Sequence, residues 1–318
     1  MVPGVRAAQR LPWLLLLLLP LLGAPSALPV LRWRGGANSG DYAFSLTSFN
    51  PEGRLEQLDH AFQAVARAPP VLALCGDHCV VLAAVMPTDR YGLARSATTK
   101  VPALTTAGTV GTFSGLAADG RVLLQRVQAA ALQYEATLAS SMPPARLAAV
   151  IAETLQEATQ QGGTRPFGCT ILLGGLGADG TPQLMQIDPA GNVAFAKATA
   201  IGWGADGLIS QVSERWSPDL TAENVQTLAR DLLLEALRST PAKATDWAAS
   251  SEIHIAVVDF AATHKERRSS SAGSGAAAPL GRDTLPGEPW RLSTRTFAVG
   301  HSPTQQENSE DGGDKEET

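Results

Sequence analysis

The first periodic stretch of the chain predicts a short amphipathic helix. Between residues 50 and 66, apolar side chains recur at spacings of three and four, which is the period of a helix with one apolar face. These apolar positions are Leu55, Leu58, Phe62 and Val65. Asn50 is a favourable N-cap, and Pro51 suits the first helical position, where a missing N–H costs nothing. The pattern therefore predicts a helix over 50–66 that ends before Pro69 and Pro70.

Two short apolar runs follow this helix directly. The runs "VLALC" (71–75) and "CVVLAAV" (79–85) contain no charged residue and are separated by Gly76-Asp77-His78. A tight turn between two short apolar segments is typical of a β-hairpin. The absence of an alternating polar face indicates strands that are buried on both sides. The sequence therefore predicts a fully buried hairpin with an amphipathic helix placed directly ahead of it.

The rest of the folded chain alternates helix pairs with runs of strands. A less regular stretch rich in Thr and Gly, 91–116, precedes two helices, three strands, two further helices and a last strand. The predicted helices are 121–139, 144–159, 208–216 and 222–237, and the predicted strands are 167–175, 182–188, 193–202 and 252–260. This order lacks the strand–helix–strand repeat of a parallel sheet. It predicts an α+β fold in which two antiparallel sheets are stacked and helix pairs cover their outer faces, a four-layer sandwich.

Both ends of the chain differ in composition from this folded part. Residues 1–27 contain two arginines, then the apolar run "LPWLLLLLLPLLG", then small residues, and the run is shorter than the roughly 20 apolar residues that cross a bilayer. This order predicts a secretory or organelle-entry leader, with an uncleaved anchor or an extension that is never made as the alternatives. We assign 28–40 to an N-terminal tail, 41–260 to the folded domain and 261–318 to a low-complexity and acidic tail. Within the last region, "WRLSTRTFAVG" (290–300) could form one more strand.

The charge and the cysteines argue against several kinds of partner and site. The net charge is −5 and no concentrated basic face is evident, so nucleic acid is not a predicted partner. The string "CGDHC" (75–79) groups two thiols with an imidazole, but a zinc site requires four converging ligands, and Cys169 stands alone in an apolar run. We therefore predict no metal site. Cys75 and Cys79 are interpreted as small core residues, with a redox pair across the hairpin as the alternative.

The residues of covalent catalysis and of phosphate binding do not occur in the required patterns. The five histidines show no motif that ties one of them to a nucleophile and a carboxylate. The string "FSGLA" lacks the glycine two residues before Ser114 that a nucleophile elbow requires. The glycine-rich strings "GGLGADG" and "GWGADG" lack the lysine of a phosphate loop, and Arg165-Pro166 indicates a turn into a strand. These patterns predict no cofactor.

Five ordered segments nevertheless resemble a single family. The segments are "YAFSLTSFNPEGRLEQLDHAFQAV", "FSGLAADGRVLLQR", "TQQGGTRPFGCTILLGG", "QIDPAGNVAFAKATAIG" and "EIHIAVV". In this order, over 42–258, they are similar to the signature segments of α-type subunits of the 20S proteasome, and the first most resembles the second α type. The resemblance implies an N-terminal-nucleophile hydrolase-like αββα sandwich of two antiparallel sheets, which agrees with the order of the predicted elements.

The resemblance also implies that the leading helix covers a site without catalytic residues. In β-type relatives a threonine is uncovered at the start of the first strand and works with an Asp and a Lys, whereas α-type subunits keep the leading segment as a helix across the sandwich. Alignment of the first hairpin puts Pro69 or Pro70 at the threonine position and Val85 at the Asp position. None of these side chains can attack a peptide or carry a charge. We therefore predict no catalytic residue. A self-processing enzyme of this fold would need Thr, Ser or Cys at the strand start.

By the same resemblance, α-type subunits gate the pore with their N-terminal tails and receive activator C-termini between neighbouring subunits. The gate-related positions correspond to Tyr42, Pro51 and His60. Ala43 stands in place of the usual Asp, and His60 in place of a tyrosine. The lysine that pairs with an activator carboxylate corresponds to Lys100 in "TTKVPAL", after one inserted residue. The alternative is that His60 simply faces solvent and that Lys100 is an ordinary surface lysine.

The resemblance predicts a non-catalytic subunit of the 20S core that acts in ring assembly, pore gating and activator docking for ubiquitin-dependent protein degradation. Its predicted partners are the other α-type subunits of a heptameric ring, β-type subunits and the C-termini of regulatory particles, with no membrane contact in the mature form. Its predicted location is the cytoplasm and nucleus. The leader-like residues 1–27 motivate the alternative, a diverged copy sent to the secretory route or to a plastid-associated compartment, acting outside the standard particle.

Overall fold

The part of the chain that the structure describes lies within one compact unit. The structure is a computed structural model, and it describes residues 48–88, 100–161, 163–240, 251–260 and 291–298. All of them belong to the unit that spans 39–318. The predicted leader, the tail 28–40, Tyr42 and Ala43, and the acidic C-terminal end lie outside the described residues.

The first sheet has five antiparallel strands in the order β7-β1-β2-β8-β9. Its strands are β1 (Val71–Cys75), β2 (Cys79–Pro87), β7 (Ala198–Ile201), β8 (Ser251–Asp259) and β9 (Arg291–Ala298). The hairpin register pairs Val71 with Ala84 and Cys75 with Val80. All of β1 and the first seven residues of β2 are buried, because both strands are internal to a sheet that is covered on both faces. The predicted buried hairpin is confirmed.

The second sheet has four antiparallel strands in the order β3-β4-β5-β6. Its strands are β3 (Val110–Gly115), β4 (Cys169–Leu176), β5 (Pro182–Ile187) and β6 (Val193–Ala196). The turn between β5 and β6 is held by the Asp188 carboxylate, which accepts the backbone N–H groups of Ala190 and Asn192 at 2.9 Å each. Aspartate in this position mimics a backbone turn, which explains why the sequence signalled a tight reversal here.

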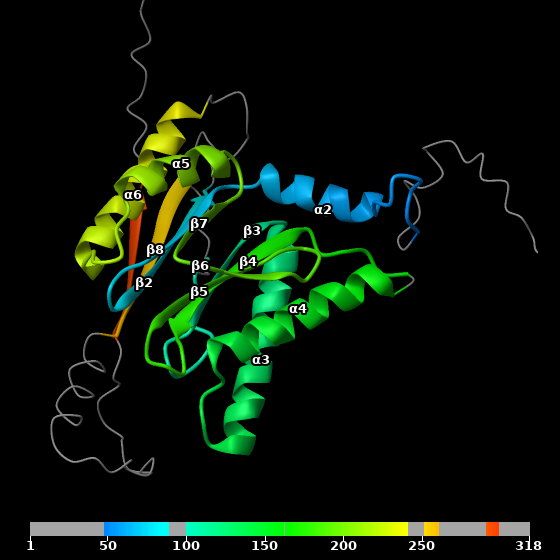
Figure 1. Cartoon of the computed structure of the whole chain (residues 1–318), viewed down its shortest axis with the longest axis horizontal. Coiled ribbons are helices and arrows are strands. Elements are labelled where there is room, and N and C mark those ends of the chain that lie inside the picture. The colour runs from blue at the N-terminus through cyan, green and yellow to red at the C-terminus, as the bar shows by residue number, and fades with distance from the viewer. Residues whose placement is uncertain (1–47, 89–99, 162, 241–250, 261–290, 299–318) are drawn as a thin grey trace, which may run out of the picture. The chain divides into compact units, whose positions relative to one another are not determined.

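Helix pairs cover the outer faces of the two sheets, as Figure 1 shows. Helices α3 (Ala117–Leu138) and α4 (Pro144–Gln160) pack on the second sheet, and α5 (Ala205–Arg215) and α6 (Ala222–Ser239) pack on the first. Each helix pair shares an apolar core with its own sheet, and a third apolar core lies between the sheets. Each Val, Leu or Ile buried there contributes about 1.5–3 kcal/mol relative to its exposed state. The four-layer αββα fold predicted from the sequence is confirmed.

The leading helix begins later than the sequence predicted. Helix α2 spans Glu56–Ala66 and follows Leu55, not Asn50. Asn50 instead organises a turn, in which its side-chain oxygen accepts the N–H groups of Glu52 and Arg54 at 3.1 Å and 2.8 Å. The prediction of Pro51 at the first helical position was wrong because Asn-Pro-x-Gly is also a favourable β-turn sequence. Gly53 ends the turn with a positive φ of 77°, which glycine adopts readily.

The buried face of α2 also differs from the predicted apolar stripe. Ala61 and Val65 are its buried residues, whereas Phe62 remains 39% exposed. The helix packs on β3 and β4 at the edge of the second sheet. A narrow contact of this kind needs a small residue where helix and strands approach closely, so Ala61 occupies that position and the larger Phe62 lies at its margin.

The segment predicted as a single strand over 193–202 is divided between the two sheets. β6 pairs with β5, and β7 pairs with β1, so the chain crosses from one sheet to the other at Lys197. The backbone carbonyl of Lys197 accepts the N–H of Cys75 at 2.8 Å, which fixes the crossing against the end of β1. The prediction of one continuous strand was wrong because extended backbone continues through the crossing with almost no change in the residue pattern.

Two further observations concern the ends of the folded part. The strand suggested by "WRLSTRTFAVG" is confirmed as β9, which pairs with β8 from Glu252 opposite Ala298 to Asp259 opposite Arg291. Among the described residues, none of the helices combines the length and the apolar character needed to cross a membrane.

Candidate functional site

The segment between α2 and β1 is held by three successive backbone carbonyls. The carbonyl of Ala68 accepts the N–H of Trp203 at 2.9 Å, and the carbonyl of Pro70 accepts the N–H of Val85 at 3.0 Å. Between them, the carbonyl of Pro69 accepts the hydroxyl of Ser114 at 2.9 Å. The two prolines have no N–H group, so the segment leaves no backbone donor there that would need a partner. The chain therefore runs into Val71, the first residue of β1, through a tightly fixed junction.

Gly202 makes room for this junction. Its φ of +96° lies in the region that favours glycine, and a Cβ added to it would come within 2.8 Å of both the Pro69 carbonyl oxygen and the Ser114 hydroxyl. The glycine thus allows the start of β1, the end of β7 and β3 to converge at one point. A larger residue at 202 would separate them.

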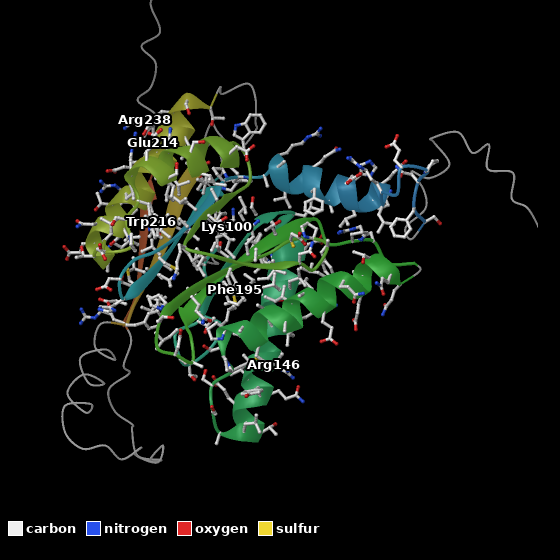
Figure 2. All side chains as sticks on the ribbon, in the orientation of Figure 1. Lys100, Arg146, Phe195, Glu214, Trp216 and Arg238 are labelled. Carbon is white, nitrogen blue, oxygen red and sulfur yellow. The ribbon has the colours of Figure 1, made fainter. Side chains whose placement is uncertain are left out.

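Lys100 lies inside the sandwich. Its side chain is 8% exposed, and its Nζ donates a hydrogen bond of 2.8 Å to the backbone carbonyl of Val85. The ammonium group also lies 5.6 Å from the centroid of the Phe113 ring, within the range of a cation–π contact. Lys100 is labelled in Figure 2, beside the strands of the sandwich. Burial lowers the pKa of Lys100 to about 7, since desolvation disfavours the charged form. In the isolated chain Lys100 is therefore not an ordinary surface lysine.

The buried charge of Lys100 predicts a pH-dependent stability. The unfolded side chain has a pKa of about 10.5 and the folded one about 7. Burial of the protonated lysine therefore lowers the free energy of unfolding by its full amount below pH 7. This destabilisation disappears as the pH rises from about 7 to about 10.5. We expect Lys100→Met to raise the free energy of unfolding by about 2 kcal/mol at pH 6 and by much less at pH 10.

Urea unfolding of the full chain at the two pH values measures this difference. The matched control is Arg146→Met on the exposed surface of α4, which should change stability by less than about 0.5 kcal/mol at either pH. A Lys100→Met variant that is less stable than the wild type at pH 6 would contradict the prediction.

The two gate-related positions that the structure describes lie on exposed surface. Pro51 is exposed in the turn that precedes α2, and His60 is exposed on α2 itself. Tyr42 lies outside the described residues. Because Lys100 is buried, it shares no exposed surface with Pro51 and His60 in the isolated chain.

The cysteines of the "CGDHC" string point to different cores. Cys75 belongs to the core between the sheets, and Cys79 to the core under α5 and α6, so the thiols lie on opposite faces of the sheet. The alternative of a redox pair across the hairpin is therefore wrong. Burial raises the pKa of Cys75 to about 12 and that of Cys79 to about 11, which disfavours the reactive thiolate. Within the described ranges no group of three or more Asp, Glu, His or Cys side chains could hold a metal ion.

The sequence interpretation missed one ion pair, in which the Asp119 carboxylate is buried and the Arg165 side chain is partly exposed. Arg165 donates two hydrogen bonds to the Asp119 carboxylate at 2.6 Å and 2.8 Å, and the same carboxylate accepts the N–H of Gly168 at 3.0 Å. The Arg165 side chain holds the pKa of Asp119 below its ordinary value, against the opposing effect of burial, and the Gly168 N–H lowers it further. The interpretation of Arg165-Pro166 as a turn into a strand gave no signal for a partner 46 residues away.

The sequence of the chain is similar to a known protein family. Residues 65–258 match the family model described as proteasome subunit. The chain is 33% identical over 188 residues to proteasome subunit alpha type-2 of Dictyostelium discoideum, covering 59% of this chain and 80% of that protein. It is 34% identical over 197 residues to proteasome subunit alpha type-2 of Saccharomyces cerevisiae, covering 62% of this chain and 78% of that protein. With proteasome subunit alpha type-2-B of Arabidopsis thaliana it shares 34% identity over 184 residues, 58% of this chain and 77% of that protein.

Proposed function

This chain belongs to the proteasome subunit family and is similar to its alpha type-2 members, and from this premise we propose that it is a non-catalytic subunit of the α ring of the 20S core. Its work there would be to assemble with neighbouring α-type and β-type subunits, to contribute to the pore gate and to receive activators, in the cytoplasm and nucleus. Hydrolysis would belong to partner chains.

The observation that carries this proposal is which residues form the junction ahead of β1. The residues that join α2 to β1 include two prolines, Pro69 and Pro70, and Val85 lies opposite Pro70. A nucleophile of this fold needs a free amino group and a Thr, Ser or Cys at the strand start. None of Pro69, Pro70 and Val71 has a side chain of this kind. The arrangement supports a subunit that acts through its surfaces.

The gate-related residues extend the proposal to the rim of the subunit. Pro51 and His60 would act through exposed surface, where the imidazole could donate to or accept from a neighbouring tail. Lys100 would bind an activator carboxylate if that group reached the interior and replaced the Val85 carbonyl as its partner. A carboxylate at Nζ would restore the charged form of the lysine, since an opposite charge offsets desolvation.

Co-expression of the full chain with the other α-type and β-type subunits tests the proposed function. We expect the chain to enter a particle of 20S size on native gels, and the purified chain alone to show no peptidase activity and no new N-terminus at β1. A matched sample that replaces this chain with an unrelated α+β protein sets the background. Recovery of the chain only as a monomer, or peptide cleavage by the chain alone, would contradict the proposal.

A further inference from the structure

The three carbonyls at the start of β1 accept hydrogen bonds from donors in different sheets. The donors to Ala68 and Pro70 are backbone N–H groups of Trp203 and Val85, which adjoin or belong to β7 and β2 of the first sheet. The donor to Pro69 is the side chain of Ser114, which belongs to β3 of the second sheet. The Ser114 hydroxyl therefore ties the junction to the opposite sheet. It is also the member of the three that a side-chain substitution can remove.

Helix α2 is anchored to the second sheet along one narrow face, and the junction at its C-terminal end adds to that anchor. Of its eleven residues, Ala61 and Val65 are buried. The turn ahead of it is closed by bonds of Asn50 to its own neighbours. The exposed residues of the helix are His60, Phe62, Gln63 and Ala66, and this face is open to solvent or to a neighbouring chain. The junction therefore helps to set the position of α2 from its C-terminal end.

We propose that the Ser114 hydroxyl is a latch: it ties the Ala68–Pro70 junction to β3 of the second sheet and thereby keeps α2 packed on β3 and β4. Ser114 is fully buried, so water does not replace the bond when it breaks. Gly202 leaves no spare volume beside the bond, since a single added Cβ would contact both of its atoms at 2.8 Å. Ser114 is thus a positioning residue for the helix that the proposed function requires to stay attached, and the inference rests on that function for its biological meaning.

Hydrogen exchange on the full chain tests the latch. In Ser114→Ala we expect the amides of Ala68 and Trp203 to exchange about fivefold faster than in the wild type, since one hydrogen bond of ordinary net strength is lost. Amides inside β2 and β8, such as those of Val81 and Val257, should exchange at the wild-type rate. Trypsin should also cleave faster at the exposed Arg67, because the bond that follows it belongs to the junction.

Two further variants separate the latch from general destabilisation. Ser114→Cys keeps an unbranched side chain with a weak S–H donor and should restore part of the slow exchange at Ala68. Ser210→Ala on the exposed face of α5 removes a hydroxyl of the same kind, and it should leave the junction unchanged. Unchanged exchange at Ala68 and Trp203 in Ser114→Ala, or an equal acceleration throughout β1, β2 and β8, would overturn the proposal.

The result of the hydrogen-exchange experiment is independent of the co-expression test of the proposed function. Exchange at the junction is measured in the chain itself, whether or not the chain enters a particle. A chain that shows the latch but remains monomeric would contradict the proposed function and leave the latch in place. A chain that assembles but shows no acceleration in Ser114→Ala would contradict the latch and leave the function in place.

Discussion

Gly115→Ala is expected to prevent stable folding of the chain. Gly115 ends β3 at a φ of +122°, and a Cβ added there would lie 2.1 Å from the carbonyl oxygen of Gly168 and 2.7 Å from the Cα of Cys169. Both are backbone atoms of the neighbouring chain segment, so no side-chain rotation can relieve the contact. The same Gly168 carbonyl accepts the N–H of Leu116 at 2.8 Å, and moving it would break that bond. Backbone strain and displacement together should cost more than about 4 kcal/mol.

Urea unfolding and the yield of soluble full chain measure the effect of Gly115→Ala. Gly207→Ala provides the matched control, because Gly207 lies inside α5, its φ is ordinary and nothing lies within 4 Å of the added Cβ. Alanine favours the helix over glycine there, so the control should gain about 0.5–1 kcal/mol. A soluble Gly115→Ala variant whose midpoint matches the wild type would show that the second sheet can adjust at this point and would contradict the prediction.

The architecture was predictable because local pattern and tertiary environment agree in most of the chain. The apolar runs 71–75 and 79–85 could be satisfied only by burial on both faces, and a hairpin inside a covered sheet provides that. Helix α4 begins at Pro144, as the position of the proline predicted, since a helix start tolerates the missing N–H. In these elements one physical requirement dominates, so the sequence is unambiguous.

Where two structures satisfy the same residues, the pattern did not decide between them. Asn50-Pro51 suits both a helix start and a β-turn, and the backbone bonds of the turn decide in favour of the latter. The crossing at Lys197 depends on where two sheets end relative to each other, and that distance is not encoded in any local window. Both errors concern boundaries, and neither changes the order of the layers.

The candidate site was less predictable because its geometry depends on pairs far apart in the sequence. Ser114 meets Pro69 over a separation of 45 residues, and Arg165 meets Asp119 over 46. The sequence interpretation considered Ser114 as a nucleophile and set it aside, but a serine hydroxyl can also donate a hydrogen bond to a distant carbonyl. The burial of Lys100 likewise follows from packing against β2 and β3, which a charged residue in a polar string does not signal.

Asp119→Asn is expected to destabilise the fold by about 2–3 kcal/mol at pH 7. Asp119 lies in the first turn of α3 with a side chain that is 9% exposed, and its carboxylate satisfies both Arg165 and the N–H of Gly168. An amide can accept one of these donors but places an NH2 group opposite the guanidinium. The Arg165 side chain is 57% exposed and recovers part of its hydration, so the loss should be smaller than for a fully buried pair. Thermal and urea unfolding of the two chains measure it.

The pH dependence distinguishes lost charge from lost shape in Asp119→Asn. The folded state holds the pKa of Asp119 below the ordinary value of 3.8, so its stabilisation is present above pH 4 and is lost as the pH falls through the folded pKa. The difference between Asp119→Asn and the wild type should therefore shrink below pH 4. In the matched control, Asp231→Asn, the carboxylate pairs with Arg230 on the exposed face of α6, and a change below about 0.5 kcal/mol is expected because water screens such a pair. A constant difference between pH 7 and pH 3 would assign the effect to packing alone. It would contradict a stabilising role for the charged pair of Asp119 and Arg165 at the α3–β4 contact.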